Sequence, residues 1–353
     1  MPVLRVFGRK KVQRAQAEKE LQARRAERTQ EVLVNENGSG REGQSTAQAG
    51  NGWEGLNMTQ TTRAARATYT RPLEVESEWI GTRRYFSNLP YTLPKDAPEA
   101  DRLNFQHYYL RRLFKGLYLA PLEKRFLRAV LDVGCGTGRW ACEMALDFPH
   151  TQVVGLDIEL PRPGALIKPP NLAFTEGNVL ARLPFKDHSF NYVYQRMLAA
   201  AIPTIQWPAV VAELTRVTCP GGWIELIEAG DNYLNIGPAL TQFLHWSRAI
   251  NGERGIDTGR VAYLDDLLMG ASLSRVEKRV LRVPVGTWGG RMGSTLAQNI
   301  LAAFEGMRGI YCQKVPLYPE QFDATLAILP GEWNTYRTEF AIFAAYGQVR
   351  EDS

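Results

Sequence analysis

The chain is poor in cysteine and has no long apolar run. Its four cysteines are scattered, with no CxxC pair and no histidine spacing suited to zinc. We therefore expect no disulfide framework and no metal site, but reduced thiols in a cytoplasmic protein. No apolar stretch approaches the roughly 18 residues that cross a bilayer, so we also expect no contact with a membrane.

The beginning of the chain lacks the apolar core of a secretory signal and has few aromatic residues. Only three of the 36 aromatic residues precede residue 76. The formal net charge of +5 also arises there, because residues 1–31 hold nine basic and four acidic side chains. The remaining residues carry 33 of each sign, which gives little support to a nucleic-acid partner.

Residues 1–75 are expected to form a basic, then low-complexity, disordered tail before one domain at 76–350. Residues 9–31 favour helix but have no continuous apolar stripe to bury. Residues 35–62 are rich in Gly, Ser, Asn and Gln, and they cannot offset the entropy lost on ordering. The cluster Arg9-Lys10-Lys11 has two interpretations: a solvated helical extension, which we favour, or a nuclear-import-like signal.

Short apolar runs alternate with helical patterns from residue 129 onward. The runs lie at 129–133, 153–156, 172–174, 190–194 and 223–227, with helical patterns at 139–147 and 207–217. This alternation predicts an α/β fold with a parallel sheet covered by helices on both faces. Residues 99–128 look helical and aromatic, and two longer strands are expected at 276–285 and 338–346, with mostly helical residues between them.

The strongest motif is a glycine-rich turn at residues 131–138, with the sequence LDVGCGTG. Its glycines permit positive φ and let the backbone approach a ligand, and a helix beginning at Arg139 would offer its N-terminus. Asp157, at the end of the next strand, can accept hydrogen bonds from both hydroxyls of a ribose. Because Gly136 to Ala141 also fits G-x-G-x-x-A, these two features leave NAD and S-adenosylmethionine as alternatives.

Further blocks carry a family resemblance. Gly177-Asn178, the sequence LPFKDHSFN at 183–191, and PGG at 220–222 follow the glycine turn in order. Together they resemble class I S-adenosylmethionine-dependent methyltransferases, and they are not expected of a nicotinamide dehydrogenase. The upstream sequence YTLPKD at 91–96, with Gln106-His107, resembles a narrower group, the LaeA-type methyltransferases that regulate fungal secondary metabolism, and their bacterial relatives.

The resemblance covers about residues 79–347 and implies a Rossmann-like class I methyltransferase fold. This fold has a seven-stranded, mostly parallel sheet with helices on both faces. It further implies a helical N-terminal lid at 99–128 and a helical insertion at 286–334 between the last two strands. Residues 129–230 would bind the cofactor, S-adenosylmethionine, and residues 231–350 would form the substrate side.

The resemblance implies that the glycine turn contacts the methionine part of the cofactor, that Asp157 binds its ribose and that Asn178 contacts its adenine. Asn178 stands where many relatives have aspartate, so it keeps a carbonyl acceptor for the adenine amino group but loses the charge. The expected cofactor-binding set is Asp132, Gly134, Cys135, Gly136, Gly138, Asp157, Ile158, Asn178, Val179 and Gln195.

No residue is assigned a catalytic role from the sequence. Displacement at a sulfonium mainly requires alignment and exclusion of water. His107 is the candidate base, although a single histidine on an amphipathic helix is more often structural. The expected acceptor is a small molecule or peptide, in or regulating secondary metabolism. The alternative is a regulatory protein that acts through a protein partner with little turnover.

Methylation of nucleic acid is disfavoured, because Gln195-Arg196-Met197 stands where an N/D-P-P-Y motif would lie.

Deletion of residues 1–75 is expected to leave the affinity for S-adenosylmethionine unchanged, because neither the tail's charge nor its composition contributes to the expected site. Isothermal titration calorimetry on the full and shortened chains measures this. A large loss of affinity in the shortened chain would show that the tail packs on the domain.

Overall fold

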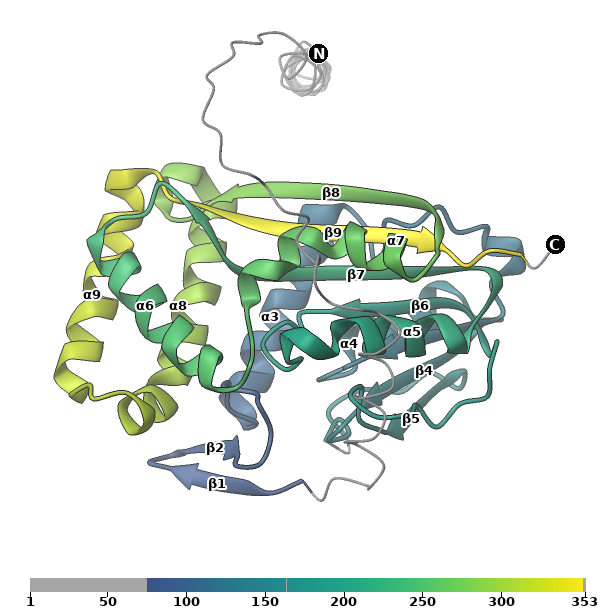
Figure 1. Ribbon diagram of the computed structural model, residues 1–353, viewed down its shortest axis with the longest axis horizontal. Helices are drawn as coiled ribbons and strands as arrows, with labels where there is room; N and C mark the ends of the chain where they lie inside the picture. The colour runs from purple at the N-terminus through teal and green to yellow at the C-terminus, as the bar shows by residue number, and fades with distance from the viewer. Residues whose placement is uncertain (1–74, 163, 352–353) are drawn as a thin grey trace, which may run out of the picture. The chain divides into compact units, whose positions relative to one another are not determined.

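The computed structural model of the protein describes residues 75–162 and 164–351. A seven-stranded sheet forms its centre (Figure 1). In spatial order the strands are β5 (Leu172–Glu176), β4 (Gln152–Asp157), β3 (Ala129–Val133), β6 (Phe190–Arg196), β7 (Thr218–Leu234), β9 (Glu339–Gln348) and β8 (Ser274–Pro284). The first five run parallel, and β9 is antiparallel to both of its neighbours. The expected mostly parallel sheet is confirmed, whereas residues 1–74 of the expected tail lie outside the described residues.

Two helices between the strands have the bounds that the sequence predicts. They are α4 (Arg139–Asp147) and α5 (Trp207–Val217). Five more helices surround the sheet: α3 (Ala97–Phe114), α6 (Pro238–Glu253), α7 (Leu264–Gly270), α8 (Gly290–Lys314) and α9 (Pro319–Tyr336). Short 3-10 turns occupy 124–126, 204–206, 258–263 and 287–289.

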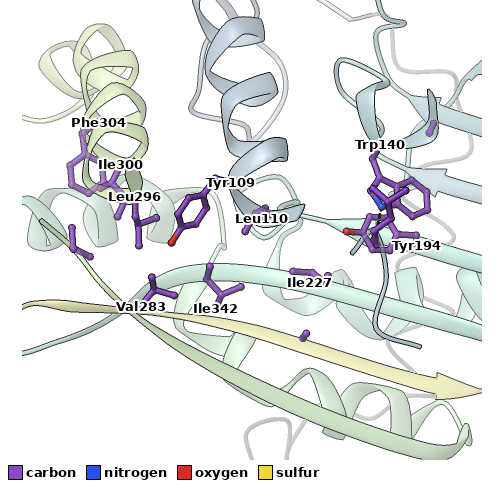
Figure 2. Packing of buried hydrophobic residues seen from close by; sticks show 14 of the residues in the cluster. Tyr109, Leu110, Trp140, Tyr194, Ile227, Val283, Leu296, Ile300, Phe304 and Ile342 are labelled. Carbon is purple, nitrogen blue, oxygen red and sulfur yellow. Dashed lines mark hydrogen bonds between the residues drawn. The ribbon is translucent and has the colours of Figure 1, made fainter. Parts of the chain in front are cut away.

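The sheet separates two hydrophobic cores, because successive residues of each strand point to opposite faces. On β3, Val130 joins the core with α3, α4, α6, α8 and α9, whereas Leu131 and Val133 join the core with α5 and α7. On the first face Trp140 stacks on Tyr194, with 3.9 Å between ring centroids and 5° between planes (Figure 2). Buried aromatic pairs of this kind anchor α4 against the centre of the sheet.

The helix expected over 99–128 is shorter in the structure. It begins at Ala97 because the Asp96 side chain accepts a hydrogen bond from the Glu99 backbone N–H at 3.1 Å. It ends at Phe114 because Lys115 adopts a left-handed conformation, with φ 56°, and closes the last turn. Three features lie outside what the sequence predicted: the hairpin of β1 (Ser77–Ile80) and β2 (Arg83–Phe86), helices α6 and α7, and the full length of β7.

The expected helical insertion is confirmed as α8 and α9, which lie between strands β8 and β9. The insertion leaves the sheet after Pro284 and returns at Glu339, and these two residues are register partners in the β8–β9 ladder. Figure 1 shows α6, α8 and α9 gathered beyond the end of the sheet at which β7 ends. α3 packs on α8, and α6 packs on α9. Helices therefore cover the carboxyl edge of the parallel strands, where ligands of open α/β folds bind.

Within the described part of the chain, no helix combines the length and the apolar character needed to cross a membrane.

A buried carboxylate joins the insertion to α6. Glu332 of α9 is 7% exposed and accepts hydrogen bonds from the backbone N–H groups of Ala239 and Leu240, at 2.7 and 2.8 Å. Gly237, the N-cap residue of α6, has no side chain that could satisfy them. Glu332 therefore caps α6 from a separate helix, and it complements the positive end of the helix dipole.

Substitution Glu332→Ala is expected to lower the free energy of unfolding by about 2–3 kcal/mol, because two buried N–H groups lose a charged acceptor. Urea denaturation measures the change. The control is Glu320→Ala, at an exposed position in the first turn of α9, which should change the free energy by less than about 0.5 kcal/mol. Equal effects of the two substitutions would contradict the capping role.

Candidate cofactor site

A cavity opens at the carboxyl edge of the sheet, between the glycine turn, the ends of β4 and β6, and α3. Of the ten residues that the sequence predicted, eight line this cavity: Asp132, Gly134, Cys135, Gly136, Asp157, Ile158, Asn178 and Val179. Gly138 and Gln195 do not line it. The topology thus brings together side chains that are up to 47 positions apart in the sequence, since parallel strands end at one edge.

The glycines of the turn have distinct roles in its geometry. Gly134, Gly136 and Gly138 have φ values of 69°, 55° and 72°, in the left-handed region that favours glycine. A Cβ at Gly138 would lie 2.5 Å from the Phe174 ring, so this glycine allows the turn to pack against β5. A Cβ at Gly136 would meet only Leu103, at 3.9 Å, so here the backbone faces the open cavity.

Asp157 is held in place by the backbone around it. Its Oδ2 atom accepts a hydrogen bond from the Gly136 N–H at 2.7 Å, and its Oδ1 atom accepts one from the Glu159 N–H at 3.2 Å. The Lys95 Nζ atom lies 3.7 Å from Oδ1. Because the carboxylate is fixed before any ligand arrives, little side-chain entropy remains to be lost on binding.

Asp132, at the end of β3, is 4% exposed, and its Oδ2 atom has no hydrogen-bond partner. Burial raises the pKa of this carboxyl group to about 7; the charge of Arg196 opposes that rise and the charge of Asp157 adds to it. Buried polar atoms are almost always paired in proteins, with protein groups, water or ligand. The open oxygen therefore points to a ligand that donates a hydrogen bond or carries a positive charge.

The side-chain amide of Asn178 has the opposite orientation to the one that the sequence predicted. Its Oδ1 atom already accepts a hydrogen bond from the Leu180 backbone N–H at 2.9 Å, and its buried Nδ2 group is without a partner. The side chain therefore presents a donor, whereas the sequence predicted a carbonyl acceptor. An Asx-type turn of this kind is a common use of an asparagine carbonyl, and it fixes the orientation of the amide.

His107 of α3 lies in the wall of the cavity with both ring nitrogens near fixed partners. Its Nε2 atom is 3.0 Å from Glu143 Oε2, and its Nδ1 atom lies 3.2 Å from the Arg196 guanidinium. Burial, together with the charges of Arg196, Arg111 and Arg139, lowers the pKa of His107 to about 3. The imidazole is neutral at physiological pH and positions its neighbours, so the geometry favours the structural interpretation over a general base.

Several residues of the cavity wall were not predicted from the sequence. Lys95 and Arg139 line it, as does the segment around Tyr91. Lys95 and Tyr91 belong to the block at 91–96 that carried the family resemblance, which is the signal that could have identified them. Gln195 is wholly buried and donates to Glu228 at 3.3 Å, whereas the next residue, Arg196, reaches the cavity.

Among the residues that the structure describes, no group of three or more metal-ligating side chains comes together.

Comparison with known proteins agrees with this geometry. A family model described as a methyltransferase domain matches residues 130–222. Methyltransferase pytC of Aspergillus terreus is 29% identical over 207 residues, which are 56% of this chain and 62% of that protein. The secondary metabolism regulator LAE1 of Cochliobolus heterostrophus is 30% identical over 209 residues, which are 56% of this chain and 67% of that protein.

The chain belongs to the class I S-adenosylmethionine-dependent methyltransferases, and it resembles the LaeA-type members. It spans about 62% of the length of pytC. Among solved structures, phosphoethanolamine N-methyltransferase 2 of Haemonchus contortus in complex with S-adenosyl-L-methionine has a TM-score of 0.43 and 14% identity, covering 69% of this chain and 52% of that chain.

The cofactor of this methyltransferase family is S-adenosylmethionine, and the residues of the cavity fit it. The ligand has an ammonium group, two ribose hydroxyls and an adenine ring. The cavity offers a buried carboxylate at Asp132, a preset carboxylate at Asp157 and backbone without a side chain at Gly136. The unpaired Nδ2 group of Asn178 adds a donor for a ring nitrogen.

Binding of S-adenosylmethionine is expected to weaken as the pH falls below about 7. The pKa of Asp132 is about 7, so its carboxylate is charged above that pH and can attract the ammonium group, whereas protonation below it removes the attraction. Affinity should fall by up to about tenfold per pH unit between pH 7 and 5. Calorimetry across this range measures the slope.

The variant Asp132→Asn cannot titrate and should show weaker binding with a flat profile over the same range. Asp101→Asn, at an exposed position on α3, should keep the slope of the unmodified chain. If the affinity of Asp132→Asn for S-adenosylmethionine still falls as the pH is lowered, a group other than Asp132 causes the pH dependence.

Proposed function

We propose that the protein transfers a methyl group from S-adenosylmethionine to a small molecule or peptide, in or regulating secondary metabolism. The single observation that carries this proposal is the hydrogen bond from the Gly136 N–H to Asp157 at the wall of an open cavity. It joins the two motifs by which the family holds its cofactor. A site that no longer binds a cofactor would not need to keep both the fixed carboxylate of Asp157 and the exposed backbone of Gly136.

In this proposal the chain contributes binding, orientation and exclusion of water. The bound cofactor would supply a methyl group on a sulfonium, which is already electrophilic. A lone pair of the acceptor would form the bond to the methyl carbon as the carbon–sulfur bond breaks, S-adenosylhomocysteine would leave, and a proton carried by the acceptor atom would pass to solvent. Asp157 would hold the ribose, Asp132 the ammonium group, and α3 covers the cavity from the side of Leu103 and Gln106. Alignment of the reactants and exclusion of water by the bound ligands would account for most of the acceleration that a displacement of this kind requires.

His107 does not supply a charge in this proposal. Its low pKa keeps it neutral, and its Nδ1 atom meets the guanidinium of Arg196 at the end of β6. Glu143 of α4, whose Oε2 atom lies 3.0 Å from Nε2, is paired with Arg111 of α3. We therefore assign it a positioning role, in which it fixes the guanidinium of Arg196 at the wall of the cavity.

A second candidate function is regulation through a protein partner with little turnover. The similarity to LAE1 of Cochliobolus heterostrophus, a secondary metabolism regulator, favours it. The open oxygen of Asp132 argues for ligand binding under either function, so turnover is the measurement that separates them.

Incubation of the full chain with a cell extract and methyl-labelled S-adenosylmethionine is expected to yield a labelled product. Asp157→Ala should weaken cofactor binding about ten- to a hundredfold, because charged hydrogen bonds are each worth about 1.5–3 kcal/mol. Asp147→Ala, at an exposed position at the end of α4, is the matched control and should bind as well as the unmodified chain.

Cofactor binding without any labelled product would support the regulatory function. Absence of binding, or equal binding by Asp157→Ala, would contradict methyl transfer at this site.

A further inference from the structure

A second cavity, here called the acceptor chamber, adjoins the cofactor cavity. It lies between α3, α6, α8 and the ends of β7 and β9, and it holds about 1100 Å³, counting space open to solvent. Four residues belong to the walls of both cavities: Tyr91, Leu103, Gln106 and Met197. A ligand in the chamber would therefore reach the edge of the cofactor cavity.

The walls of the acceptor chamber are mostly aliphatic and aromatic. Phe243 of α6 stacks on Phe304 of α8, with 3.7 Å between ring centroids. Figure 2 shows Leu296 and Ile300 of α8 close to Tyr109 of α3, and all three line the chamber. Apolar walls with a few polar groups are typical of sites for small organic ligands.

The charged side chains of the chamber wall are already paired within the chain. Of the described residues that line it, only Arg102 and Asp231 carry charge. Arg102 donates to Glu99 through Nε and Nη2, at 2.8 and 2.7 Å. Asp231 accepts from Arg248 at 3.0 Å and from the hydroxyl of Thr258. A charged ligand would find no unpaired opposite charge there, and its desolvation would cost several kcal/mol, on the order of the penalty for a buried ion.

Among the buried side-chain atoms of the described wall, two polar atoms have no hydrogen-bond partner. The hydroxyl of Tyr109 is unpaired on a side chain that is 4% exposed. Asn251, 7% exposed, donates from Nδ2 to Ser247 at 3.3 Å, which leaves its Oδ1 atom without a hydrogen bond. Each unsatisfied buried group costs about 1–3 kcal/mol, so both atoms favour a ligand that pairs with them.

We propose that the methyl acceptor is a neutral, largely apolar small molecule that occupies this chamber and hydrogen-bonds to Asn251 Oδ1 and the Tyr109 hydroxyl. The inference rests on the proposed function, because the chamber is an acceptor site only if the neighbouring cavity binds the methyl donor. A peptide fits the chamber less well. Each peptide residue brings a donor and an acceptor that must be paired when buried, whereas most of the wall is apolar and only two of its buried side-chain polar atoms are unpaired.

The first test uses Nile red, a neutral apolar dye, as the probe of the chamber in the full chain. Ala303 of α8 lines the chamber but not the cofactor cavity, so Ala303→Trp should fill the chamber. We expect this substitution to weaken dye binding at least tenfold in a fluorescence titration. The control, Gln298→Trp, is at an exposed position of the same helix and should leave dye binding unchanged.

The second test uses Tyr109→Phe, which removes only a hydroxyl that has no protein partner. The thermal unfolding temperature and the affinity for S-adenosylmethionine should be equal to or above those of the unmodified chain. Transfer of labelled methyl to the neutral, solvent-extractable fraction of an extract should show a KM raised about three- to tenfold, as expected for one lost hydrogen bond.

The outcomes separate this inference from the proposed function. If the unmodified chain fails to bind S-adenosylmethionine in calorimetry, the proposed function fails, and the inference fails with it even if dye binding marks the chamber. If the cofactor binds but Ala303→Trp binds the dye as the unmodified chain does, the chamber inference alone is overturned. Label found only in peptides, proteins or nucleic acid also overturns it, whereas label in the neutral fraction that Tyr109→Phe reduces supports it.

Discussion

The candidate cofactor site depends on one hydrogen bond, from the Gly136 N–H to Asp157. This bond joins the turn after β3 to the end of β4, and the Gly134 and Cys135 N–H groups strengthen the junction by donating to the Leu156 carbonyl at 2.7 and 2.9 Å. The turn can approach the end of β4 so closely only because its glycines accept positive φ. The carboxylate, the uncovered backbone and the start of α4 are therefore positioned together.

Much of the fold and of the candidate cofactor site was predictable, because the apolar periodicity of the sequence and the motifs of the family resemblance predict the same elements there. The bounds of α4 and α5 follow from apolar periodicity, and the glycine turn with Asp157 follows from motif spacing. The end of α3 was not predictable, because Lys115 adopts a left-handed conformation that favours glycine. The orientation of the Asn178 amide could not be predicted from the sequence either, because a hydrogen bond from the Leu180 backbone N–H to Asn178 Oδ1 determines it.

Within residues 231–350, the sequence predicted two strands and the helical insertion between them, but it did not predict α6 and α7. The geometry of this region comes from pairs that are distant in the sequence, such as Glu332 with the start of α6 and Phe243 with Phe304. No local pattern marks Asn251 as the residue with an open carbonyl, because that follows from its bond to Ser247. The same distant contacts leave the chamber apolar and its charges compensated, while the cofactor cavity keeps an unpaired carboxylate oxygen at Asp132.

The helical insertion is attached to the sheet as the loop of a very long hairpin. Its two ends, Pro284 and Glu339, are register partners on adjacent antiparallel strands. A changed insertion would have to match this strand pair and the faces of α3 and α6 on which it packs, including the start of α6 that Glu332 caps. Strands β3, β4 and β6 with their glycine turn would stay as they are. Under the proposed function, changes in the insertion would alter which compounds are methylated and leave the parts that hold the methyl donor unchanged.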